Sequence, residues 1–287
     1  MNLYVILRTP ESGNTIMPQV YPLCLQLPIP GTHTLSYWRM PVSSETSVPQ
    51  AHHLWRWRGK VTLKQGGPMA LDYKSLKARH RKERSQYHPN LSLRIHRALS
   101  WLDRAEHSGD DPDSQYIFLW IAFNAAYANE FDIDVQLSEQ KVFTRFLNRL
   151  CALDEQGLLY TLIWSEFTGS IRILLDNKYI FKPFWDYHSG KIGQEEWESQ
   201  FKRAKQLANQ ALAKKKTAYI LKIIFSRLYT LRNQILHGGA TWNGAVNREQ
   251  IRDGVRILGR IVPAVISIMM DNPEAEWGEP CYPVLEE

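Results

Sequence analysis

The sequence predicts an all-α fold, a multi-helix bundle preceded by an irregular, proline-rich N-terminal segment. Eight of the 15 prolines lie in residues 1–68, where their spacing prevents any helix from propagating. From residue 69 onward, apolar residues recur at spacings of three and four, which is typical of amphipathic helices, and strand patterns are poor. The chain therefore divides into an extension of residues 1–68 and a helical domain of residues 69–287, with about six or seven helices.

The N-terminal extension is expected to be extended or disordered. It carries 6 Lys and Arg residues against 2 Asp and Glu residues, so it supplies most of the formal net charge of +6. The basic pI therefore says little about nucleic-acid binding by the helical domain. The alternative is a mis-assigned start, in which translation begins at Met69 and the codons of Gln65 to Pro68 contain a ribosome-binding sequence.

The first half of the helical domain contains a basic run and two well-marked helices. The basic run covers residues 74–84, and Asn90 is the expected N-cap of a helix that ends near Gly109. After a turn at residues 110–113, a further helix from Ser114 to Asn129 is apolar on nearly all sides. Such a helix is expected to lie buried at the centre of the bundle.

The second half of the domain contains the remaining helices. Periodicity predicts a helix that begins at Ser138, helices within residues 155–180, a long helical stretch from Gln194 to His237 and a final helix from Asn247 to Met270.

Cysteine content and hydropathy exclude several classes of protein. The 3 cysteines are far apart and form no Cys-x-x-Cys pair, which argues against a disulfide framework or a cysteine-based zinc site and fits a reducing cytoplasm. No stretch reaches the ~18 apolar residues of a membrane span. Phosphate-binding loops and nucleophile elbows are also missing from the sequence. We therefore expect a cytoplasmic protein without membrane segment, metal or cofactor.

The most informative segment is the end of the long helical stretch. Leu221, Phe225, Leu228 and Ile235 form a core-facing stripe, and Arg232 falls inside it. An arginine in such a stripe must find an anionic partner, reach water with its tip or face a cleft, because burying it unpaired is costly.

His237 follows five residues later and directly precedes Gly238-Gly239, which is a helix-stopping sequence. A guanidinium grips phosphate oxygens and an imidazole transfers protons, so the pair suits a phosphodiester substrate. The residues alone leave another interpretation open, in which His237 only ends the helix and Arg232 belongs to a structural ion pair.

The hexapeptide from Arg232 to His237, Arg-Asn-Gln-Ile-Leu-His, resembles the Arg-x4–6-His motif of the HEPN superfamily. A polar residue often follows the arginine of that motif, as Asn233 does here. The apolar segment at 118–128, FLWIAFNAAYA, is similar to the buried helix of ApeA-like HEPN proteins. The resemblance covers roughly residues 90–275 and does not extend to residues 1–68.

The resemblance implies a HEPN-type bundle and a metal-independent endoribonuclease that acts as a homodimer. Two copies of the motif helix would line one cleft, where the ribose 2′-OH attacks the adjacent phosphorus. His237 would act as general acid or base, Arg232 would stabilise the charged phosphate, and Asn233 would orient His237 or the phosphate. The resemblance further implies a toxin or an anti-phage effector, with RNA as substrate and an antitoxin, for example of nucleotidyltransferase type, as partner.

Residues 201–237 contain nine Lys and Arg residues and no acidic residue, which is compatible with RNA binding by counterion release. The predicted RNA contacts are Lys214, Lys215, Lys216, Arg227, Trp242 and Asn243. Trp242 and Asn243 would stack on and hydrogen-bond a base. The alternatives are a solvated basic face and a Trp242 ring that packs against the bundle.

Two rival functions remain at this point. The chain can be a non-catalytic HEPN module that binds RNA, a nucleotide or a partner protein. Alternatively, the helical domain senses a signal while residues 1–68 dock a partner.

Overall fold

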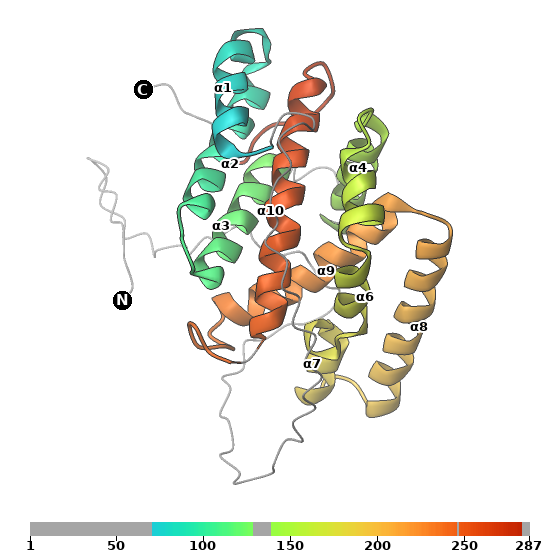
Figure 1. The fold of residues 1–287 in the computed structure, drawn as a ribbon. Helices are drawn as coiled ribbons and strands as arrows, with labels where there is room; N and C mark the ends of the chain where they lie inside the picture. The colour runs from blue at the N-terminus through green and yellow to red at the C-terminus, as the bar shows by residue number, and fades with distance from the viewer. Residues whose placement is uncertain (1–70, 129–138, 246, 283–287) are drawn as a thin grey trace, which may run out of the picture. The chain divides into compact units, whose positions relative to one another are not determined.

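The computed structural model describes residues 71–128, 139–245 and 247–282, and within these ranges the regular elements are all helical (Figure 1). This confirms the predicted all-α, multi-helix bundle. The extension of residues 1–68 and the helix start expected at Ser138 lie outside the described residues.

Ten α-helices and three short helical turns follow one another along the described chain. The α-helices are α1 Tyr73–Glu83, α2 Pro89–Glu106, α3 Pro112–Tyr127, α4 Glu139–Leu153, α5 Leu158–Thr161, α6 Thr168–Asp176, α7 Lys182–His188, α8 Gln194–Ala213, α9 Thr217–Leu236 and α10 Arg248–Asp271. The turns are η1 Arg84–Gln86, η2 Leu162–Glu166 and η3 Lys178–Ile180.

The helix starts follow local capping chemistry. Asp111 caps α3, because its carboxylate accepts hydrogen bonds from the backbone N–H groups of Asp113 and Ser114. Pro112 occupies the first turn, where its missing N–H costs nothing. At α2 the prediction was wrong by two residues: His88, not Asn90, is the N-cap, and its ring accepts from the Asn90 N–H.

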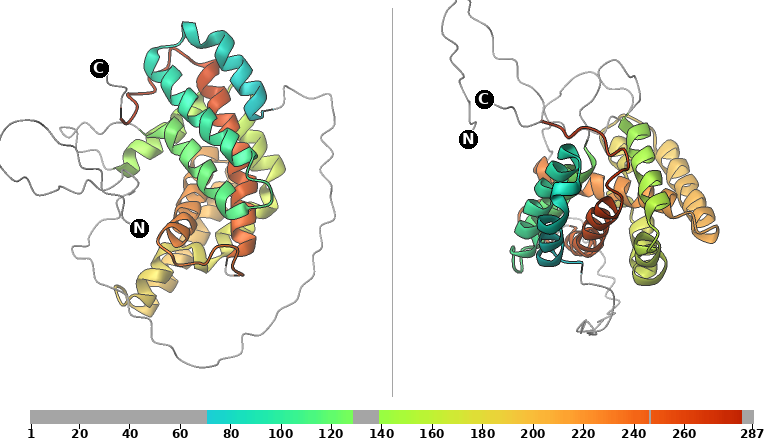
Figure 2. Two further views of the ribbon diagram at one scale, coloured as in Figure 1. Left: turned by 90° about the vertical axis from the view of Figure 1, so that its left-hand side faces the viewer. Right: turned by 90° about the horizontal axis from the view of Figure 1, so that it is seen from above.

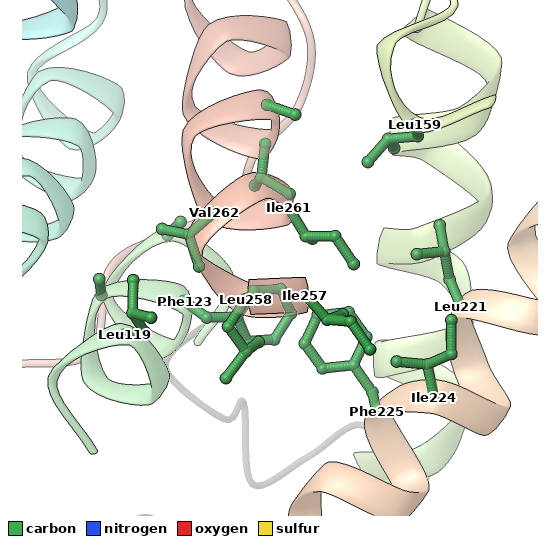
Figure 3. Packing of buried hydrophobic residues seen from close by; sticks show 14 of the residues in the cluster. Leu119, Phe123, Leu159, Leu221, Ile224, Phe225, Ile257, Leu258, Ile261 and Val262 are labelled. Atoms are coloured by element: carbon green, nitrogen blue, oxygen red, sulfur yellow. The ribbon is translucent and has the colours of Figure 1, made fainter. Parts of the chain in front are cut away.

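The core lies where α10 passes between the α1–α3 group and α4 (Figures 1 and 2). Helix α3 packs against α2, α9 and α10 and has no exposed residue, as expected for a buried helix, but the central position is taken by α10 (Figure 1). Figure 3 shows apolar side chains of α3, α5, α9 and α10 meeting in one cluster, and the rings of Phe123 and Phe225 stack there with centroids 4.2 Å apart. Each such buried side chain contributes about 1.5–3 kcal/mol, which holds α9 against the centre of the bundle.

A close approach of α3, α9 and α10 occurs at Gly254. A Cβ atom at this position would lie 2.5 Å from Cε2 of Tyr116 and 3.3 Å from Cδ2 of Leu228. The hydroxyl of Tyr116 donates to the backbone oxygen of Leu228 at 2.6 Å, so the tyrosine ties α3 to α9 in the space that glycine leaves open.

The long helical stretch predicted from Gln194 to His237 is interrupted. Residues 214–216 separate α8 from α9, and Lys215 adopts a left-handed conformation with φ 49°. The break allows α8 to return along α9 and pack against it. Apolar periodicity did not reveal the break, because the spacing continues on both sides of it.

No single described helix combines the length and apolar composition of a membrane span. Two consecutive segments, Leu158–Glu166 and Thr168–Asp176, reach that composition only together, and they are bent by 73°.

Candidate functional site

The Arg232–His237 hexapeptide lies at the C-terminal end of α9. Leu236 is the last helical residue; the backbone N–H of His237 donates to the carbonyl oxygen of Asn233, and that of Gly238 donates to the carbonyl oxygen of Ile235. Gly238 then takes a φ of 71°, which ends the helix as the sequence predicts.

Arg232 is buried, with 4% of its surface exposed. Its Nη1 donates to Oδ1 of Asn233 at 2.8 Å, and its guanidinium carbon lies 5.9 Å from the ring centroid of Tyr229. The Nε atom is buried without a hydrogen-bond partner. Burial lowers the pKa of Arg232 from its ordinary value, but an arginine keeps its proton at neutral pH. No carboxylate of the described residues pairs with this cation, so the structural ion pair considered from the sequence is not found there.

Tyr116 is fully buried and close enough to Arg232 to feel its charge, and sequence reasoning missed it. Burial raises the pKa of its phenol well above the ordinary value, with Arg232 opposing the shift through its charge. The neutral hydroxyl is already committed to the Leu228 carbonyl oxygen. Tyr116 therefore stays neutral and supplies no counter-charge to Arg232.

His237 is exposed, and its ring makes no hydrogen bond or ion pair with the described residues. Helix geometry places it about 140° around the axis from Arg232 and about 7.5 Å further along it. Within one chain, the two side chains therefore leave α9 on different faces. Asn233 lies one turn before His237, and its side-chain amide oxygen Oδ1 accepts the hydrogen bond from Arg232.

Gln234, inside the hexapeptide, fastens the end of α9 to two other elements. Its Nε2 donates to the Tyr179 carbonyl oxygen at 2.7 Å, and its Oε1 accepts from Nδ2 of Asn247 at 2.6 Å. The backbone N–H of Gly239 also donates to the Gln234 carbonyl oxygen. These bonds fix the loop that follows His237, a role that a lone glutamine in the sequence does not reveal.

The same loop is tied to the start of α3 by a buried ion pair. Nη1 of Arg248 lies 2.6 Å from Oδ2 of Asp113, and both side chains are largely buried. The same carboxylate oxygen accepts from the backbone N–H of Asn243 at 3.2 Å. The ion pair of Asp113 and Arg248 was not predicted from the sequence, because the two residues lie 135 positions apart in the chain.

The structure places Trp242 and Asn243 at the surface of this loop. Trp242 is 73% exposed, and its Nε1 donates to Oδ2 of Asp111 at 3.3 Å. Most of its side chain is therefore open to solvent, contrary to the alternative in which it packs against the helices. Asn243 is exposed as well, with a left-handed φ of 53°.

Lys214, Lys215 and Lys216 are exposed but lie at the opposite end of α9 from His237. At 1.5 Å per residue, about 30 Å of helix separates the two ends. Lys215 donates from Nζ to the Tyr160 hydroxyl at 3.2 Å. Within one chain, these lysines and His237 do not line a common cleft.

Arg227 corrects the sequence-based expectation, because it is buried and its guanidinium lies over the rings of Phe181 and Phe201. Its guanidinium carbon lies 4.2 Å from the ring centroid of Phe181, and its Nη1 has no hydrogen-bond partner. Burial lowers the pKa of Arg227 to about 10. A residue held between aromatic rings in this way is not part of a basic surface that RNA reaches.

Among the residues that the structure describes, no group of three or more His, Cys, Asp or Glu side chains is placed to hold a metal ion. Comparison of the chain with protein-family models, with curated proteins and with solved structures returned no match.

Proposed function

We propose that the protein is a metal-independent endoribonuclease of HEPN type that acts as a toxin or anti-phage effector. The observation that carries the proposal is a buried cation, Arg232, at the helix end where His237 is exposed; among the described residues Arg232 has no carboxylate partner, and the His237 imidazole has no hydrogen bond or ion pair. An unpaired buried cation attracts a phosphate more strongly than an exposed one because the local dielectric is low.

In the proposed reaction, His237 takes the proton of the ribose 2′-OH as this oxygen attacks the adjacent phosphorus. The bond from phosphorus to the 5′-oxygen breaks, and a protonated imidazole donates a proton to that leaving oxygen. The products are a 2′,3′-cyclic phosphate and a 5′-hydroxyl. Arg232 stabilises the negative charge of the pentacovalent phosphate, and Asn233 holds the guanidinium in place.

A homodimer accounts for the divergence of the two side chains. Arg232 and His237 leave α9 on different faces, so a cleft that uses both is completed more readily by a second α9. Leu236, next to His237, is 45% exposed and offers apolar surface that a second copy can cover.

The test is RNA cleavage by the full chain in the presence of EDTA. Wild-type protein should produce 2′,3′-cyclic phosphate ends, and His237→Ala and Arg232→Gln should each reduce the rate by about 10²-fold or more. His107→Ala is the matched control, because His107 is an exposed histidine on another helix end. Equal rates for all variants, or no cleavage by the wild type, would contradict the proposal.

A second experiment addresses the biological role. Expression in bacteria should inhibit growth, and His237→Ala should relieve the inhibition. Co-expression with an antitoxin, for example of nucleotidyltransferase type, should relieve it as well.

The burial of Arg232 also favours a second candidate, a non-catalytic module that binds RNA, a nucleotide or a partner protein. In that case Arg232 serves the structure through its bond to Asn233. Such a module would bind RNA without cutting it, and Arg232→Gln would lower its stability while His237→Ala would leave RNA binding unchanged.

A further inference from the structure

A hollow of about 460 Å³ opens on the surface between α4 and α9. Its lining consists of polar and cationic side chains, Gln140, Lys141, Thr144, Arg145, Asn148 and Lys222. None of these lining residues is acidic, so the hollow, called here the α4–α9 groove, carries a positive potential.

The three cations of the groove are without ion-pair partners among the described residues. Lys141 and Arg145 lie one turn apart on α4 and are exposed, while Lys222 comes from α9 and is half-buried. Other cations of the bundle do have carboxylate partners, as Lys205 has in Asp176 at 2.7 Å and Arg260 has in Glu166 at 2.8 Å. Three like charges held around one hollow favour an anionic ligand with several charges.

The groove and the end of α9 share one face of the helix. Starting from Lys222, spacings of four, four, three and four reach Ser226, Thr230, Asn233 and His237, and none of these five residues is buried. The buried residues of α9 lie on the other side of the helix, from Ile220 to Arg232. An unburied strip of about 22 Å therefore leads from the groove to His237.

We propose that the α4–α9 groove binds the sugar–phosphate backbone of single-stranded RNA about 22 Å along α9 from His237, where the bond is cut. The inference rests on the proposed ribonuclease function and names the RNA-binding track of that site. Lys141, Arg145 and Lys222 contact phosphates, and Asn148 and Gln140 hydrogen-bond to riboses or bases. Because phosphate contacts carry no sequence information, the three cations bind RNA without selecting its sequence.

The experiment measures RNA binding as a function of salt in a His237→Ala background, which leaves the RNA intact. A fluorescent single-stranded oligonucleotide is titrated with full-length protein carrying Lys141→Gln, Arg145→Gln and Lys222→Gln together. Three lost phosphate contacts should reduce the slope of log K against log salt by about 2 and weaken binding at low salt about tenfold or more.

The matched control is Lys74→Gln, Arg81→Gln and Lys82→Gln on α1. It removes the same charge from exposed residues that have no ion pair with the described chain, and the slope should stay within about 0.5 of that of the parent protein. Equal slopes for the groove variant and the control variant would overturn the proposal. Because Lys222 is half-buried, the double variant Lys141→Gln/Arg145→Gln repeats the test at exposed positions alone.

Failure of the groove and failure of the nuclease give different results. If wild type cuts RNA and the groove variant binds it unchanged, the groove proposal falls and the nuclease proposal stands. If wild type does not cut RNA but the groove variant loses affinity, the groove holds and the chain is a binding module.

Discussion

Nη1 of Arg232 donates a hydrogen bond to Oδ1 of Asn233, its neighbour in the chain, at a distance of 2.8 Å. An amide oxygen thus satisfies part of the guanidinium without neutralising it. A carboxylate in the same place would cancel the positive charge that the proposed phosphate contact requires.

Asn233→Asp is therefore expected to separate stability from activity. The new carboxylate pairs with Arg232, so the free energy of unfolding should stay the same or rise, while RNA cleavage should fall by about tenfold or more. Urea unfolding and cleavage rates of the variant and the wild type check this. Cleavage at the wild-type rate in Asn233→Asp would show that the charge of Arg232 is not used.

Leu236→Asp is expected to weaken self-association, because it places a charge on the apolar surface beside His237. Sedimentation should show a shift from dimer to monomer, and the cleavage rate at low protein concentration should drop with it. Leu207→Asp, at a similarly exposed leucine of α8, is the control and should leave the dimer intact. A Leu236→Asp variant that is monomeric and fully active would contradict the shared cleft.

Gly254→Ala should destabilise the fold by about 1–3 kcal/mol, because its Cβ would collide with the Tyr116 ring. The collision also displaces the hydroxyl that binds the Leu228 carbonyl oxygen. Gly259→Ala in the same helix is the matched control, since the nearest atom to its Cβ would lie 3.9 Å away. The free energy of unfolding of the control should rise by about 0.5–1 kcal/mol, because alanine has a higher helix propensity than glycine. Urea unfolding of the two variants and the wild type measures both changes.

Asp113→Ala should lower the free energy of unfolding by about 3–5 kcal/mol, because the largely buried Arg248 guanidinium loses its carboxylate partner and keeps only its bond to the Gly244 carbonyl oxygen. Removing both side chains should recover part of this loss, as a double-mutant cycle would reveal. The comparison is Glu249→Ala, which breaks the exposed pair with Arg252 and should change stability by no more than about 1 kcal/mol. Similar losses for the two acidic residues would contradict the assigned burial of Asp113.

Because of His80, we expect the free energy of unfolding to decrease in mild acid. Burial, helped by the positive charges of Lys77, His96 and Arg84, lowers the pKa of His80 from 6.5 to about 4. Between these values the unfolded chain binds a proton that the folded chain does not, so the free energy of unfolding decreases as the pH falls from 6.5 to 4.

At pH 5 this loss is on the order of 1–2 kcal/mol relative to pH 8. His80→Gln should show a smaller decrease over the same range, measured by urea unfolding at pH 8 and pH 5. An unchanged pH dependence in this variant would mean that His80 is not the group that titrates.

The sequence by itself determined that the chain from residue 69 is helical and where α9 ends, because both depend on neighbours in the chain. Apolar spacing marks the helical faces and Gly238 marks the end of α9, whereas α3 begins at Pro112, inside the turn that the sequence predicted at residues 110–113. The same reasoning placed Arg232 on the core-facing side of α9, where it is buried.

Only the tertiary structure decided which side chains meet. It enclosed Arg227 between aromatic rings of other segments, paired Asp113 with Arg248 and brought Lys141 and Arg145 of α4 beside Lys222 of α9. Periodicity fixes the face on which a residue lies but not the distant element that covers it, because that depends on how all the apolar faces are buried together.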